Sequence, residues 1–223
     1  MSLVLATEIK QAIKNDQFVG AIIYGQQRMG KSSYAAKVMY EIYQDWDMVN
    51  LHMLFKLDDV VRLLEEATDR GIRIPCFCWD DCGVHGNKLL YFQERTLVQY
   101  LGDLLDTAGI SVGGILMTTP SPFKLLAVIR GYEFYRVKVT AKNTSHGRRA
   151  VGYKSILLPS GTRLIRRVYS DEFNVMLPEE FWGSYVAKRR SYLQFGLRQL
   201  RKLVGRHHAE MAADDNILAD SEA

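Results

Sequence analysis

The chain has 223 residues, of which 48% are hydrophobic and 24% are charged, and its formal net charge is +4. These values exclude a wholly disordered or collagen-like protein, and the length allows one α/β domain with extensions. The net charge hides an uneven distribution, because residues 181–209 carry seven bases and no acid, whereas residues 210–223 carry five acids and no base. The sequence therefore predicts a nearly neutral body over residues 1–180, then a basic segment and an acidic tail.

The apolar runs of the sequence are short, and none approaches the roughly 20 residues that a membrane span needs. No basic segment followed by an apolar core opens the chain, so we expect no signal peptide. Cys76, Cys78 and Cys82 lack a fourth ligand at zinc spacing, which favours core packing over a structural metal site. We therefore expect a cytoplasmic protein without membrane contact, disulfides or a structural metal.

The strongest motif lies between an apolar, strand-like segment, 19–24, and a helix-compatible segment, 34–43. There the sequence reads G-x-x-x-x-G-K-S, from Gly25 to Ser32, in the strand–loop–helix context of a phosphate-binding P-loop. The glycines allow backbone N–H groups to turn toward phosphate oxygens, and the following helix adds its N-terminal dipole. The residues expected to bind nucleotide are Gly25, Gln26, Gln27, Arg28, Met29, Gly30, Lys31, Ser32 and Ser33.

Two of these residues are expected to act through their side chains. Lys31 is placed to reach the β- and γ-phosphates, and the Ser32 hydroxyl is placed to ligate Mg²⁺. Since the sequence has no N-K-x-D guanine motif, ATP is the expected nucleotide, with Mg²⁺ as its metal.

A second part of this chemistry is an apolar strand that ends in carboxylates, at residues 72–81. Asp80 is placed to hold Mg²⁺, and Asp81 is placed to orient or deprotonate the attacking water. The alternative is a strand that simply ends in an acidic turn.

A third strand is predicted at 113–120 and carries Thr118 and Thr119 at its carboxyl end, which faces the ligand crevice in open α/β sheets. Because side chains alternate along a strand, only one of these threonines can face the nucleotide, unless both merely cap the strand. Arg130 is the first candidate for an arginine that contacts the γ-phosphate, in its own or a neighbouring subunit, and Arg136 is the second. An ordinary surface arginine is the alternative interpretation.

The remaining pattern predicts helices at 3–17, 57–68 and 89–106 and strands at 134–139, 150–158 and 162–169, while 47–55 fits either state. A turn at Pro159-Ser160-Gly161 makes residues 134–169 a β-hairpin extension. The predicted fold class is α/β: a P-loop NTPase three-layer sandwich with a mainly parallel sheet, this hairpin and a C-terminal helix.

Residues 181–208 place apolar side chains at helical spacing with bases between them, which predicts a basic amphipathic helix. This helix either packs on the body with a solvated basic face or binds nucleic acid. Binding to a membrane surface is a weaker alternative than either, in line with the expected absence of membrane contact. Residues 209–223 are expected to be disordered. The candidate nucleic-acid contacts are Arg148 and Arg149 in the hairpin and Lys188, Arg189, Arg190, Arg198, Arg201 and Lys202 in the helix.

Taken together, these residues resemble the small P-loop ATPases of archaeal spindle-shaped viruses (fuselloviruses), often called DnaA-like. The resemblance covers residues 18–192. It rests on the segments 21–25 with 30–35, 80–83, 118–122, 177–178 and 185–190.

The resemblance implies an ATPase of an archaeal virus or mobile element that acts on DNA in replication initiation or genome maintenance. We also expect the protein to form a homo-oligomer. A DNA packaging or translocation motor is one alternative. A nucleotide-dependent switch or assembly scaffold without DNA activity is an alternative of a different class.

Overall fold

The computed structural model describes residues 2–82, 95–142 and 144–221. By its internal contacts the chain forms two units, Met1–Phe181 and Trp182–Ala223. The first unit contains the whole sheet, and the second consists of most of helix α8 (Glu179–Ser221).

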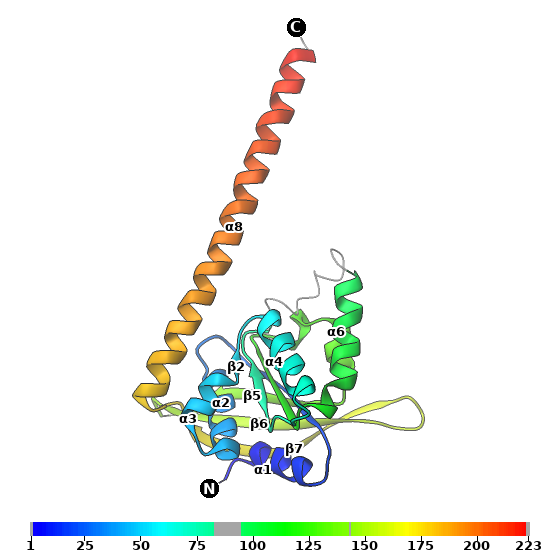
Figure 1. Cartoon of the computed structure of the whole chain (residues 1–223), viewed down its shortest axis with the longest axis vertical. Helices are drawn as coiled ribbons and strands as arrows, with labels where there is room; N and C mark the ends of the chain where they lie inside the picture. The colour runs from blue at the N-terminus through cyan, green and yellow to red at the C-terminus, as the bar shows by residue number, and fades with distance from the viewer. Residues whose placement is uncertain (1, 83–94, 143, 222–223) are drawn as a thin grey trace. The chain divides into compact units, whose positions relative to one another are not determined.

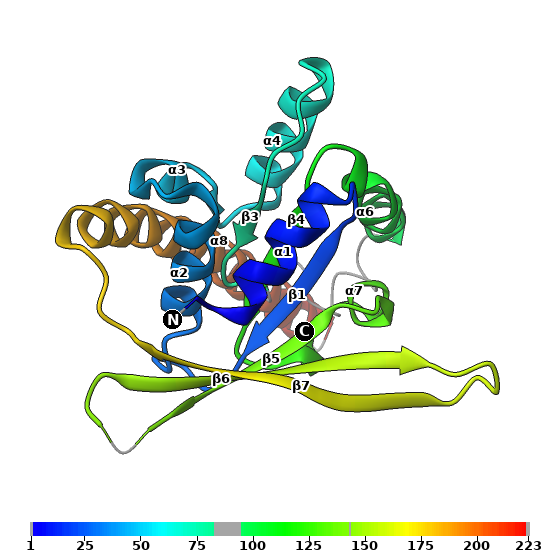
Figure 2. The same cartoon turned by 90° about the horizontal axis from the view of Figure 1, so that it is seen from below.

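One seven-stranded sheet runs through the first unit in the order β2-β3-β4-β1-β5-β6-β7 (Figures 1 and 2). The first five strands of this order are parallel, and β6 and β7 continue the sheet as an antiparallel hairpin. The strands are β1 (Val19–Tyr24), β2 (Met53–Leu54), β3 (Phe77–Trp79), β4 (Gly114–Thr119), β5 (Tyr135–Ala141), β6 (Gly147–Leu157) and β7 (Arg163–Asn174).

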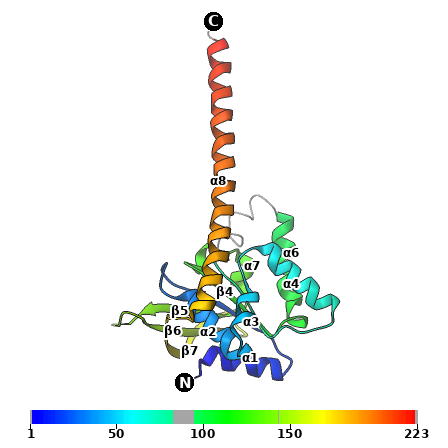
Figure 3. The same cartoon turned by 60° about the vertical axis from the view of Figure 1, so that its left-hand side comes forward.

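The helices of the first unit form the two outer layers. They are α1 (Val4–Lys14), α2 (Lys31–Tyr43), α3 (Trp46–Leu51), α4 (Leu57–Asp69), α6 (Arg95–Thr107) and α7 (Ala127–Gly131), with short 3₁₀ turns at Ala108–Ile110 and Pro122–Lys124. Helices α6 and α7 lie on one side of the central strands and α2 on the other in Figure 2, and Figure 3 shows α4 beside α6. Parallel strands need such crossovers, so both faces of the sheet are covered.

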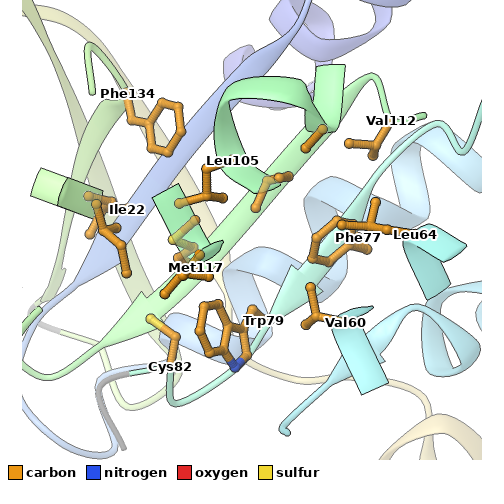
Figure 4. Close-up of a cluster of buried hydrophobic side chains, with 14 of the residues drawn as sticks. Ile22, Val60, Leu64, Phe77, Trp79, Cys82, Leu105, Val112, Met117 and Phe134 are labelled. Atoms are coloured by element: carbon orange, nitrogen blue, oxygen red, sulfur yellow. The ribbon is translucent and has the colours of Figure 1, made fainter. Parts of the chain in front are cut away.

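Alternation along the strands divides the core between the two faces. Ile22, Phe77, Trp79, Ile115 and Met117 belong to the cluster that α4, α6 and α7 cover (Figure 4). The intervening residues of the same strands are also buried, because α1 and α2 cover the other face. Continuous apolar strands such as 19–24 therefore follow from burial on both sides.

The structure confirms the predicted fold class and the hairpin at 134–169, with its turn at Pro159–Gly161. The ambiguous segment 47–55 contains both states, helix α3 and then strand β2. The helix predicted at 89–106 is observed from Arg95, and residues 89–94 of that prediction lie outside the described residues.

The prediction for the end of the chain differs from the structure. Helix α8 does not end at residue 208 but continues to Ser221, through the acidic segment that we expected to be disordered. The physical reason is local, since residues 209–221 contain neither Gly nor Pro and include Ala, Glu, Met and Leu, which favour helix. Among the described residues, no helix is long and apolar enough to cross a membrane.

Candidate nucleotide-binding site

The loop between β1 and α2 has the backbone conformation of a P-loop, and two glycines make it possible. Gly30 has φ +88°, in the region that residues with a side chain rarely adopt. A Cβ atom on Gly25 would lie 2.6 Å from the Val139 carbonyl oxygen of β5, and one on Gly30 would lie 2.6 Å from Val175 Cγ1. Other segments of this chain therefore approach both ends of the loop so closely that glycine is required at Gly25 and Gly30.

Lys31 and Ser32 open helix α2, so their backbone N–H groups belong to its positive end. Lys31 is 7% exposed, and its Nζ donates to the Gln26 carbonyl oxygen at 2.9 Å, within the loop itself. The ammonium group thus lies where the phosphates of a nucleotide are expected.

Asp80 follows β3 directly and is fully buried. Its Oδ1 accepts two hydrogen bonds, from Ser32 Oγ at 2.9 Å and from Thr118 Oγ1 at 2.5 Å. Three elements meet at this atom because β4 lies between β1 and β3, so their carboxyl ends share one edge of the sheet. A serine hydroxyl beside a carboxylate is an oxygen donor set that suits Mg²⁺.

The structure distinguishes the two threonines at the end of β4. Thr118 bonds to Asp80 and also accepts a hydrogen bond from the Asp81 backbone N–H at 2.9 Å. Thr119 Oγ1 instead donates to the Ser121 carbonyl oxygen at 3.1 Å, within the following turn. Thr118 is therefore the threonine that belongs to the carboxylate cluster.

Asp81 has φ +50°, an uncommon conformation for a residue with a side chain. Its N–H bond to Thr118 Oγ1 helps to hold this sharp turn directly after the buried Asp80. Strained backbone of this kind often occurs at functional sites.

Both candidate finger arginines bond to the chain around α7. Arg130 Nε donates to the Leu125 carbonyl oxygen at 3.0 Å, and Arg136 Nη2 donates to the Arg130 carbonyl oxygen at 3.0 Å. These bonds connect α7 to its preceding turn and to β5. A role of Arg130 at a neighbouring subunit's nucleotide stays a prediction.

The candidate nucleic-acid contacts separate into different environments. Arg149 is exposed and pairs with Glu172 at 3.0 Å, whereas Arg148 is half-buried on the same strand, beside Gly30 of the P-loop. Of the candidates on α8, Lys188, Arg189, Arg190, Arg198 and Arg201 are exposed, and the side chain of Lys202 lies outside the described part.

Strand β7 supports the start of α2, which the sequence did not reveal. Tyr34 Oη donates to Asp171 Oδ2 at 2.6 Å, and the same carboxylate accepts from the Val4 N–H at the start of α1. The Tyr34 ring also lies against Phe173, with ring centroids 5.1 Å apart. Burial, with Asp171 nearby, raises the pKa of the Tyr34 hydroxyl well above its usual range. No local motif signals these contacts, because 137 residues separate Tyr34 from Asp171.

The three cysteines are buried side chains of the core, as predicted. Burial raises the pKa of the Cys76, Cys78 and Cys82 thiols, so the thiolate needed for metal binding is disfavoured. Within the residues that the structure covers, no group of three His, Cys, Asp or Glu side chains is arranged to hold a metal ion.

The P-loop, the mainly parallel sheet with β4 between β1 and β3, and the buried Asp80 together define a P-loop NTPase fold. No protein-family profile matches the chain. Its sequence is 27% identical to the uncharacterized protein B-251 of Sulfolobus spindle-shape virus 1, over 90% of this chain and 85% of that one. It is also 28% identical to the uncharacterized protein ORF286 of Acidianus two-tailed virus, over 72% of this chain and 57% of that longer relative. The chain is thus similar to proteins of archaeal viruses.

Two solved structures also resemble the chain. One is the N-terminal domain of zonular occludens toxin from Neisseria meningitidis, with a TM-score of 0.43 and 13% identity over 74% of this chain and 97% of that one. The other is a KaiC-like protein from Pyrococcus horikoshii, with a TM-score of 0.34 and 14% identity over 67% of this chain and 91% of that one.

Proposed function

We propose that the protein is a Mg²⁺-dependent ATPase of an archaeal virus or mobile element that acts on DNA in replication initiation or genome maintenance. The observation that carries the ATPase is the junction at Asp80 Oδ1, which joins the P-loop serine to Thr118 on β4. A chance glycine turn would not be accompanied by a buried carboxylate bonded to the serine of the motif.

Each residue of the site has a role in this proposal. The backbone N–H groups of the P-loop and Lys31 bind the phosphates, and Ser32 and Asp80 hold Mg²⁺, directly or through water. Mg²⁺ held by these residues would supply positive charge to offset the negative charge that develops on the phosphate oxygens. Asp81 orients the attacking water or accepts its proton. Thr118 fixes the orientation of Asp80 and of the Asp81 backbone.

The role on DNA is supported by exposed basic side chains and by the resemblance to the DnaA-like fusellovirus proteins. On β6 and β7, Lys154 lies directly opposite Arg166, a like-charge pair that an anion would stabilise. Lysine and arginine side chains of this kind bind the phosphate backbone of DNA without sequence preference. Both the hairpin and α8 therefore provide candidate surfaces for DNA.

One experiment tests both the ATPase activity and the role on DNA. It measures the ATP hydrolysis rate of the full chain with Mg²⁺, with and without double- and single-stranded DNA. We expect hydrolysis that DNA stimulates, DNA binding that weakens with salt, and no hydrolysis by Lys31→Ala. Full activity of Lys31→Ala would refute the P-loop assignment. Absence of stimulation and of DNA binding at low salt would leave the switch or scaffold class, whereas directional strand movement would identify a motor.

A further inference from the structure

Helix α8 exposes a stripe of apolar side chains along one side. Leu193 is 61% exposed, Leu197 56% and Val204 46%. Because an α-helix turns about 100° per residue, these three residues lie within roughly 40° of one another around its axis. The sequence continues the series toward the end of the chain with apolar residues at the same spacing, namely Leu200, Met211 and Leu218.

The spacing of the series is that of two helices that pack along a shared seam. Its positions alternate in steps of four and three residues from 193 to 218. Two of them are polar, His207 and Asp214, and polar residues at a few seam positions restrict the register of a helix pair at some cost in stability. Most of the stability of a helix comes from packing its apolar side. The stripe therefore favours a second helix as the partner of α8.

The charges of α8 are divided along its length. Residues 188–206 carry seven basic residues and no acid, whereas residues 210–221 carry four acids and no basic residue. Since α8 is one uninterrupted helix (Figure 1), it does not fold back on itself to bring the two segments together. Arg201 and Asp215 lie about 21 Å apart along the axis, at about 1.5 Å per residue, which is beyond the screening length of about 8–10 Å. The acidic segment thus finds its basic complement on another molecule.

A second copy of α8 supplies that complement in one orientation. Parallel copies place basic segment against basic segment, whereas antiparallel copies place each basic segment against the acidic segment of the other. Arg201 and Asp215 each directly follow a position of the series, 200 and 214, so they lie on the same flank of the stripe. In an antiparallel pair with two-fold symmetry this flank of one helix meets the same flank of the other, so that Arg201 faces Asp215 of the partner subunit.

We propose that α8 is a self-association surface through which two copies of this chain pair in antiparallel orientation. The apolar stripe forms the centre of the interface, and Arg201 of each copy pairs with Asp215 of the partner subunit. The interface goes beyond the proposed ATPase function and requires neither nucleotide nor DNA. It gives a role to the exposed apolar side of α8 and to its acidic end, which the nucleotide site does not use.

Sedimentation equilibrium of the full chain, without nucleotide or DNA, tests the seam. The wild type is expected to form dimers. Leu197→Glu places a charge in the seam and is expected to raise the dissociation constant at least about tenfold. Ser191→Glu is the matched control, because Ser191 is exposed on the other side of the helix, and it should dimerise like the wild type. A monomeric wild type, or two variants that behave alike, would overturn the interface.

Charge reversal tests the orientation. In the antiparallel pair, Arg201→Glu and Asp215→Lys each place like charges opposite one another, so each variant alone is expected to dimerise about tenfold more weakly. An equimolar mixture of the two variants restores both contacts in the mixed dimer and should associate like the wild type. A parallel pair does not bring residues 201 and 215 together, so neither variant would change its association.

The mixture also separates a lost contact from a lost fold. Two misfolded variants do not rescue each other, and circular dichroism shows whether α8 stays helical in each variant. Single variants that dimerise like the wild type would refute the antiparallel orientation. Helical variants whose mixture stays monomeric would refute the pairing of Arg201 with Asp215 of the partner subunit.

Discussion

Asp80 Oδ1 accepts hydrogen bonds from hydroxyls on two different elements, Ser32 at the start of α2 and Thr118 on β4. A buried carboxylate is costly unless its oxygens are hydrogen-bonded, and these two donors satisfy Oδ1. The same two hydrogen bonds hold the Asp80 carboxylate in one orientation. At this scale the site is a small network in which each hydroxyl positions a group that the chemistry needs.

Replacing Thr118 by valine tests this network, because the change removes the hydroxyl with little change in shape. We expect the hydrolysis rate to fall about tenfold or more and the free energy of unfolding to fall by about 1–3 kcal/mol, since Asp80 loses a donor and Asp81 N–H an acceptor. Steady-state hydrolysis and urea unfolding measure the two effects.

Thr119→Val is the matched control, because Thr119 is equally buried but its hydroxyl, among the described residues, bonds within the turn, to the Ser121 carbonyl oxygen. It is expected to lose about 1 kcal/mol of stability and to hydrolyse ATP at nearly the wild-type rate. If the two variants lose activity equally, Thr118 has no special role.

At the scale of the elements, the hairpin β6–β7 is more than an addition to the sheet. Strand β7 fixes the start of α1 and of α2 through one carboxylate, Asp171, which is 6% exposed. Its last residues, with Val175, then approach Gly30. The position of the P-loop helix therefore depends on a strand that comes more than a hundred residues later.

Tyr34→Phe removes the hydroxyl that connects α2 to Asp171, and it is expected to lower the free energy of unfolding by about 1.5–3 kcal/mol at neutral pH. The pKa of Tyr34 is raised in the folded protein, so the wild type loses stability as the pH rises above the unfolded tyrosine value of about 10. The variant lacks this ionisable group and should lose stability less steeply there.

Urea unfolding between pH 7 and pH 11 measures both effects. Tyr40→Phe, on the same helix, keeps the ring that stacks on Trp46 and serves as the control. It is expected to remain within about 0.5 kcal/mol of the wild type at neutral pH. Equal loss in the two variants would show that the Asp171 contact does not stabilise α2.

At the scale of the whole molecule, the nucleotide site and the predicted DNA contacts of α8 are separated along the chain, whereas those of the hairpin lie in the same unit as the site. Every residue assigned to the nucleotide lies in the unit Met1–Phe181, whereas Arg190, Arg198 and Arg201 lie on the exposed surface of α8 in the second unit. This separation predicts that ATP hydrolysis in the absence of DNA does not depend on the basic side chains of α8.

Neutralising these three α8 arginines together to glutamine is expected to weaken DNA binding. The salt dependence of binding should also become shallower, by about one unit of slope for each DNA phosphate that the variant no longer neutralises. Hydrolysis without DNA should be unchanged. Fluorescence anisotropy with labelled DNA across a salt series measures the binding. Neutralising Arg166 and Arg167 on β7 in a second variant shows whether the hairpin also contributes, and unchanged binding in both would exclude these surfaces.

The sequence alone determined the parts of this protein that are local. The P-loop is specified by eight consecutive positions between a strand and a helix, and the hairpin by its turn and alternating strands, so both could be predicted. The helical tail was missed because its acidic, polar composition was given more weight than its helix propensity.

Only the tertiary structure decided which distant residues meet. The sequence left Thr118 and Thr119 equivalent, and the placement of β4 between β1 and β3 brought Thr118 to Asp80. The sequence also grouped Arg148 with Arg149. The register of β6 against β5 and β7 placed Arg148 beside Gly30 and paired Arg149 with Glu172. The physical reason is that a motif describes neighbours along the chain, whereas strand order and register set neighbours in space.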